Sequence, residues 1–155
     1  MSYKLPEENG LKEMLDMIIG DDAALTPADP CAAEDLSFFA RYVDPDGALV
    51  AACVADFPSA VALGASLSMI GAGGIDDMLA DKKLSETAND NFYEVMNMFS
   101  SLFMDDATSH LKLTTVDDAS EALGEISLPD CERRDYSVEA GRYGSGNVAF
   151  VICQS

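Results

Sequence analysis

Apolar residues recur three and four positions apart in two stretches of the chain, which is the spacing of one face of a helix. In segment 89–103 the shared face would carry Phe92, Val95, Met96, Phe99 and Phe103. In segment 11–19 it would carry Leu11, Met14, Leu15, Ile18 and Ile19, with Gly20 ending the helix. Ser85 is a suitable N-cap for the later helix. The pattern therefore predicts two amphipathic helices.

Strand-like stretches make up much of the remaining chain. Segments 36–43 and 48–56 flank Asp44-Pro45-Asp46-Gly47, a tight-turn sequence, and so predict a hairpin. Further strands are expected at 110–116, 133–144 and 147–154, with a turn at Gly144-Ser145-Gly146. In segment 59–69 bulky and small residues alternate, which predicts another strand following a break at Pro58.

The connections are recognised by their prolines, glycines and acids. We expect an irregular surface connection at 21–35, an exposed acidic loop at 116–132, and a short helical piece at 75–81 after a glycine-rich break. Together these elements predict a mixed α+β fold, with a largely antiparallel sheet packed by two main helices. The length of 155 residues fits a single domain spanning 1–155.

Charge and composition limit the classes of partner that this chain is expected to bind. The chain has 28 acidic and 9 basic residues, a net charge of −19 that would repel nucleic acid and anionic membranes. No apolar run approaches a membrane span, and the N-terminus does not resemble an export signal. Four widely spaced cysteines lack the close pairing of a zinc site and are expected to be reduced thiols. We therefore expect a cytoplasmic, acidic protein that binds a protein or a small molecule and holds no metal.

The outer face of the helix in segment 89–103 carries a line of polar residues. At about 100° per residue, these side chains fall within about 60° of one another, opposite the apolar stripe. We call them the polar row: Asp90, Glu94, Asn97 and Ser101. Any amphipathic helix has a solvated face, so the spacing alone does not separate a working surface from an ordinary one.

A partial repeat distinguishes this helix. Segments 9–17 (NGLKEMLDM) and 90–98 (DNFYEVMNM) match in register at their Glu, Asp/Asn and Met positions. Glu13 thus corresponds to Glu94, and Asp16 corresponds to Asn97. Both copies keep the polar positions opposite the apolar stripe, so the two main helices are predicted to be pseudo-repeated.

Asp90-x-x-x-Glu94-x-x-Asn97 resembles the D/S-x-x-x-E-x-x-N signature of the CheC, CheX and FliY chemotaxis phosphatases. That family is built from two pseudo-repeated helices on a continuous sheet. The resemblance implies hydrolysis of the aspartyl phosphate on a CheY-type response-regulator receiver domain. It implies no cofactor in this chain, since the receiver holds Mg²⁺ together with the phosphoryl group.

The resemblance also implies a role for each polar position. Asn97 would place the attacking water, because its uncharged amide both donates and accepts hydrogen bonds. Glu94 would pair with the receiver's active-site lysine, and Asp90 would assist at the rim. Glu13 and Asp16 would form a degenerate second site, because a carboxylate in place of the amide lacks the donor and repels the phosphoryl group.

Two alternatives stay open. A non-catalytic interaction module of the same fold, in a flagellar or signalling complex, would use the polar row for docking alone. A small-molecule sensor would use the space between helices and sheet, although no sequence feature identifies a ligand. The edge strands of an antiparallel sheet also leave open a homodimer.

Overall fold

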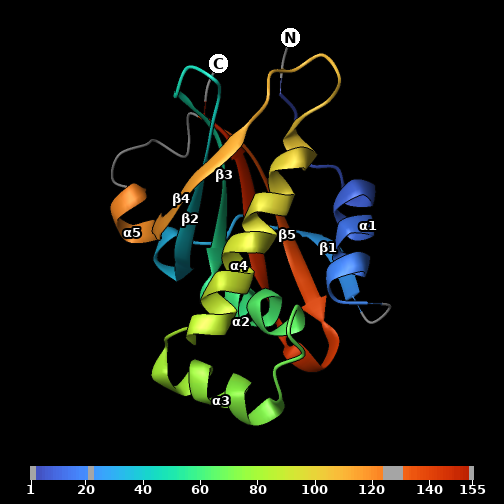
Figure 1. Ribbon diagram of the computed structural model, residues 1–155, viewed down its shortest axis with the longest axis vertical. Coiled ribbons are helices and arrows are strands. Elements are labelled where there is room, and N and C mark those ends of the chain that lie inside the picture. Colours follow the sequence, from blue (N-terminus) through green and yellow to red (C-terminus); the bar gives the residue numbers. More distant parts are fainter. Residues whose placement is uncertain (1–2, 21–22, 124–130, 154–155) are drawn as a thin grey trace.

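The fold is built on six strands that form one antiparallel sheet in the order β1-β5-β6-β3-β2-β4 (Figure 1). A computed structural model describes residues 3–20, 23–123 and 131–153. The strands are β1 (Ala23–Ala28), β2 (Leu36–Val43), β3 (Leu49–Asp56), β4 (Lys112–Asp118), β5 (Glu132–Ala140) and β6 (Ser145–Ile152).

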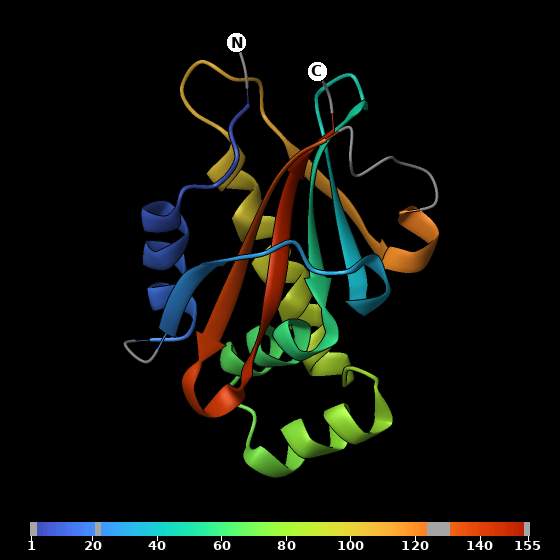
Figure 2. The ribbon, with the colours of Figure 1, turned by 180° about the vertical axis from the view of Figure 1, so that it is seen from behind.

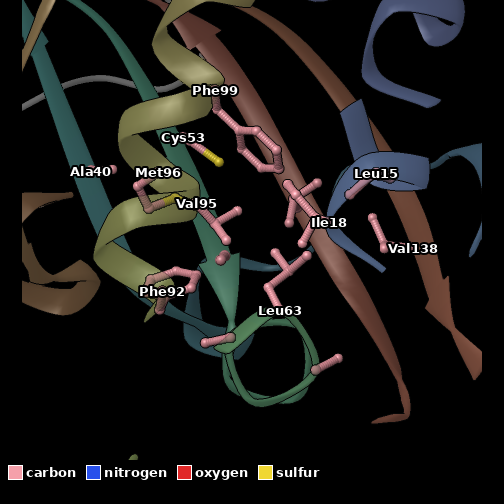
Figure 3. Close-up of a cluster of buried hydrophobic side chains, with 14 of the residues drawn as sticks. Leu15, Ile18, Ala40, Cys53, Leu63, Phe92, Val95, Met96, Phe99 and Val138 are labelled. Carbon is pink, nitrogen blue, oxygen red and sulfur yellow. The ribbon is translucent and has the colours of Figure 1, made fainter. Parts of the chain in front are cut away.

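The helices are distributed unequally over the two faces of the sheet. The larger core joins one face to α1 (Glu8–Ile18), α2 (Phe57–Ser66) and α4 (Glu86–Phe99), with α3 (Ala72–Asp81) packed beyond α2. Figure 3 shows Phe92, Val95 and Phe99 of α4 reaching into this core. The opposite face carries a smaller cluster that includes residues of α5 (Ala119–Ala122). Figure 2 shows the sheet from that side, with α4 behind the strands and α1 beside them. The predicted α+β fold with an antiparallel sheet and two main helices is confirmed.

The sheet has an internal pseudo-symmetry that places the two repeated helices. Each half of the chain contributes one of these helices followed by three strands: α1 with β1, β2 and β3, and α4 with β4, β5 and β6. Exchanging β1 with β4, β2 with β5 and β3 with β6 turns the strand order into its own reverse. Helices α1 and α4 are therefore topologically equivalent, as their shared sequence register predicted.

The prediction of a strand at 59–69 is wrong, because most of that segment forms helix α2. The Asp56 carboxylate caps this helix by accepting a hydrogen bond from the Ser59 N–H at 2.9 Å, and Pro58 lies in its first turn. Every residue from 59 to 66 is buried. Helix α2 is covered on all sides, so its sequence lacks the amphipathic period that identifies surface helices.

Two predicted connections contain regular structure. Segment 21–35 includes β1, which pairs with β5 at one edge of the sheet and there tolerates Pro27. Segment 116–132 includes the end of β4 and the short helix α5, so the exposed-loop prediction is wrong there; residues 124–130 lie outside the described part. The last turn is made by the 3-10 segment Gly141–Tyr143, with Gly144 at φ +108°, whereas Ser145 and Gly146 begin β6.

The first hairpin agrees with its sequence prediction. Strands β2 and β3 pair across the turn at 44–47, where the Asp44 carboxylate accepts hydrogen bonds from the N–H groups of Asp46 and Ala48. The short helix predicted at 75–81 is also confirmed, although α3 begins earlier, at Ala72. Within the described ranges, none of the helices combines the length and the apolar character that a membrane crossing needs.

Candidate functional site

Helix α4 is held rigidly against the sheet by its buried side. The Ser85 hydroxyl caps its first turn by accepting a hydrogen bond from the Ala88 N–H at 3.1 Å. The Tyr42 hydroxyl, buried on β2, donates a hydrogen bond to the Met96 carbonyl at 2.6 Å. Rings of Phe92 and Phe99 pack against aromatic residues of the sheet. This anchoring fixes the position of whatever the outer face presents.

The polar row lies on that outer face. Asp90, Glu94 and Asn97 are exposed on α4, and Ser101 is exposed in the 3-10 turn Ser100–Phe103 that follows. The Ser101 hydroxyl donates to the Met98 carbonyl at 3.0 Å. Among the described residues, the side chains of Asp90, Glu94 and Asn97 have no hydrogen-bond or ion-pair partner. Their polar groups are thus available to a ligand or a partner.

Both flanks of the row are tied to neighbouring elements. On one side, the Asn91 amide donates to the Gly64 carbonyl of α2 at 2.9 Å and to the Ser68 hydroxyl at 2.8 Å. On the other side, the Tyr93 hydroxyl lies 3.5 Å from the Thr114 carbonyl of the edge strand β4. Sequence reasoning missed Asn91, whose polar side chain at the margin of the apolar stripe was the available signal.

All charged residues of α4 are acidic. Glu86 lies in the first turn of α4 and is exposed, like Asp90 and Glu94. The exposed Lys82 and Lys83 follow α3 and line an open groove with the start of α4 and the beginning of β2. These two lysines are thus the cations nearest in sequence to α4. They lie before its N-terminus, whereas Glu94 and Asn97 lie in its second half.

The corresponding positions on α1 have a different environment. Glu13 is exposed, as Glu94 is. Asp16 is half-buried and accepts a hydrogen bond from Lys12, one turn earlier, in an ion pair. In the sequence register Lys12 corresponds to Tyr93 of α4. The first helix thus presents a paired carboxylate where the second presents a free amide.

Comparison with solved structures supports the fold. A chain of the CheX–CheY complex with BeF3 and Mg²⁺ from Borrelia burgdorferi superposes with a TM-score of 0.59 at 11% identity, covering 92% of each chain. FliY from Thermotoga maritima also gives a TM-score of 0.59, at 16% identity, with 92% of this chain and 81% of that chain covered. The middle domain of FliM from H. pylori gives 0.54 at 8% identity, covering 94% and 84%.

No family model and no curated protein sequence matches this chain. The fold is that of CheX and FliY, as the signature on α4 predicted. At these identities the likeness extends to the fold and not to the chemistry. The activity must therefore be argued from the side chains on α4.

Proposed function

We propose that this protein is a phosphatase that hydrolyses the aspartyl phosphate of a CheY-type receiver domain in chemotaxis or two-component signalling. The observation that carries the proposal is the exposed Glu94–Asn97 pair on a firmly anchored helix, with both side chains free of partners within the described residues. A solved structure of the same fold is a complex between CheX and CheY.

In this proposal Asn97 positions the attacking water. Its side-chain carbonyl accepts a hydrogen bond from the water, and its amide N–H₂ donates toward a phosphoryl oxygen. The water oxygen attacks phosphorus in line with the acyl oxygen of the aspartyl phosphate. The phosphorus–oxygen bond then breaks, giving inorganic phosphate and restoring the receiver's carboxylate. An uncharged amide suits this place, since a carboxylate would be repelled by the phosphoryl group.

Glu94 and Asp90 orient the receiver. Glu94 lies about one turn before Asn97 and would pair with a lysine of the receiver, which fixes the register of docking. Asp90 lies one further turn away and would contact the rim. The Mg²⁺ that neutralises the phosphoryl group would be supplied by the receiver and not by this chain. A receiver acts inside the cell, so the proposal includes a cytoplasmic location.

A second candidate is a non-catalytic interaction module. FliM domains share this fold, and solved structures from H. pylori contain FliM in complexes with SpeE and with FliG. The ion-paired Asp16 on α1 favours this reading, because it shows that one of the two equivalent helices lacks the amide. A homodimer paired through the edge strands β1 and β4 is compatible with either function.

Decay of the phosphorylated receiver, compared between wild type, Asn97→Ala and Asn89→Ala, tests the proposal. Asn89 is a matched control because it is exposed on the same helix but on the flank away from the polar row. Wild type and Asn89→Ala should accelerate decay, and Asn97→Ala should lose about 10² of that acceleration. Binding of the receiver without any acceleration by wild type would replace the phosphatase with the interaction module.

A further inference from the structure

The end of helix α2 has an unusual conformation for its sequence. The Ile70 N–H donates to the Ala65 carbonyl at 3.0 Å, and Met69 just before it has φ +51°. This is the left-handed helix end that glycine normally occupies, because a side chain there crowds the following carbonyl. Among the described residues only Met69 and Lys82 have positive φ without being glycine. Met69 therefore occupies a position where a side chain costs free energy.

The Met69 side chain does not recover that cost by burial. It is 72% exposed, and the neighbouring Leu67 is 37% exposed. Ile70 makes the contact with the hydrophobic core instead. Strained, exposed positions held by the surrounding structure are often found where a protein binds a partner. We name Leu67 and Met69 together the apolar corner.

The apolar corner is attached to the helix that carries the polar row. Ser68, between its two members, accepts a hydrogen bond from the Asn91 amide at 2.8 Å, and Asn91 directly follows Asp90. Helix α2 itself approaches α4 so closely that a Cβ on Gly64 would lie 2.5 Å from the Ala88 carbonyl oxygen. Figure 1 shows α2 beside α4, with the connection to α3 emerging next to it. An apolar surface thus adjoins the N-terminal half of the row.

We propose that the apolar corner is the second half of the docking surface for the phosphorylated receiver, an inference that rests on the proposed function. Asp90 and Glu94 have no internal cation within the described residues, so the partner should supply a basic group. Beside that group the partner should present an apolar side chain to Met69. Methionine suits such a contact, because its flexible thioether adapts to irregular surfaces.

If the apolar corner binds the receiver, substitution of Met69 should weaken binding of the receiver without slowing turnover. Met69→Gly removes the side chain and relieves the left-handed strain, so the protein should melt at a higher temperature. The KM for the phosphorylated receiver should rise about tenfold, the loss expected for one well-buried apolar contact, whereas kcat should not change. Met69→Asn, which also tolerates this conformation, should raise KM similarly, and Met69→Leu should keep it near the wild-type value.

The outcomes distinguish this inference from the proposed function. Equal KM values for wild type and Met69→Gly, with Asn97→Ala inactive, would overturn the docking role and leave the phosphatase standing. If wild type shows no phosphatase activity, the Kd for the receiver carrying BeF3 and Mg²⁺ replaces KM as the measurement. Weaker binding by Met69→Gly would then support the docking surface without catalysis. Absence of binding by wild type would overturn both.

Discussion

Asn97 on α4 and Asp16 on α1 occupy equivalent positions in the two halves of the fold, and only Asn97 has a side chain without a partner in the described structure. Asp16 is paired with Lys12 and half-buried, whereas Asn97 is exposed. The equivalence follows from the sheet order, which reads the same when the halves are exchanged. The difference between the two sites is thus one of side-chain chemistry on a common framework.

Substitution of Asp16 tests whether an amide at this position is sufficient to make the α1 site active. In an Asn97→Ala background, Asp16→Asn should restore receiver dephosphorylation by about tenfold over the single variant, equivalent to ~1.4 kcal/mol in the barrier. The amide restores a donor, and Glu13 already lies exposed one turn earlier. Asp16→Ala in the same background is the control and should restore nothing. Identical rates for the two double variants would show that α1 lacks more than the amide.

The contact between α2 and α4 should be intolerant of any side chain at Gly64. A Cβ there would meet the Ala88 carbonyl oxygen at 2.5 Å and its carbon at 3.2 Å, both in the backbone of α4. Gly64→Ala should therefore destabilise the fold by about 1–3 kcal/mol in urea unfolding. Gly73→Ala is the matched control, because nothing lies within 4 Å of its Cβ in α3, and it should stabilise by about 0.5–1 kcal/mol. A Gly64→Ala protein as stable as wild type would contradict this packing.

The features predictable from the sequence were those with a clear period or a local chemical cause. The apolar stripe from Phe92 to Phe103 identified α4, although the α-helix ends at Phe99 and continues as a 3-10 turn to Phe103. Ser85 identified its start. The turn at 44–47 identified the first hairpin. Helix α2 was missed because burial on every side removes the amphipathic period. Strand β1 was missed because an edge position accepts the proline that argued against a strand.

The candidate site, like the fold, could be predicted from the sequence only in part. The exposure of Asp90, Glu94 and Asn97 could be predicted, since residues opposite an apolar stripe face solvent. Their roles remain predictions. The pairing of Asp16 with Lys12 was also available from the sequence, because opposite charges four positions apart on a helix are neighbours, but it was missed. The position of Met69 beside α4, in contrast, depends on contacts between elements that the linear sequence does not contain. Only the assembled fold places α2 against α4.

On the face of the sheet that carries α5, removal of one partner of a buried ion pair should destabilise the protein strongly. Asp135 is 5% exposed; its carboxylate accepts hydrogen bonds from Arg133 at 2.7 and 2.9 Å and from the Cys31 N–H at 3.0 Å. Arg133→Ala would leave this carboxylate buried with fewer donors, so the free energy of unfolding should fall by about 3 kcal/mol in urea titration. Lys112→Ala, an exposed control, should change it by less than about 0.5 kcal/mol. Equal effects of the two substitutions would show that Asp135 does not depend on Arg133.

Alkaline pH should destabilise the protein through Cys153. Burial, and then a hydrogen bond with Cys131, raise the pKa of the Cys153 thiol from 9.0 to about 12. The folded state therefore holds this proton more tightly than the unfolded state does, so the stabilisation is complete below pH 9.0 and is lost as pH rises toward about 12. Cys153→Ala should reduce the slope of unfolding free energy against pH in that window, whereas Ser109→Ala, exposed in a loop, should leave it unchanged.

The raised pKa of Cys153 should also slow its alkylation, because only the thiolate reacts. At neutral pH Cys153 should be modified slowly in the folded protein and rapidly in urea. Rapid alkylation of Cys153 in the folded protein would contradict its partial burial and its raised pKa.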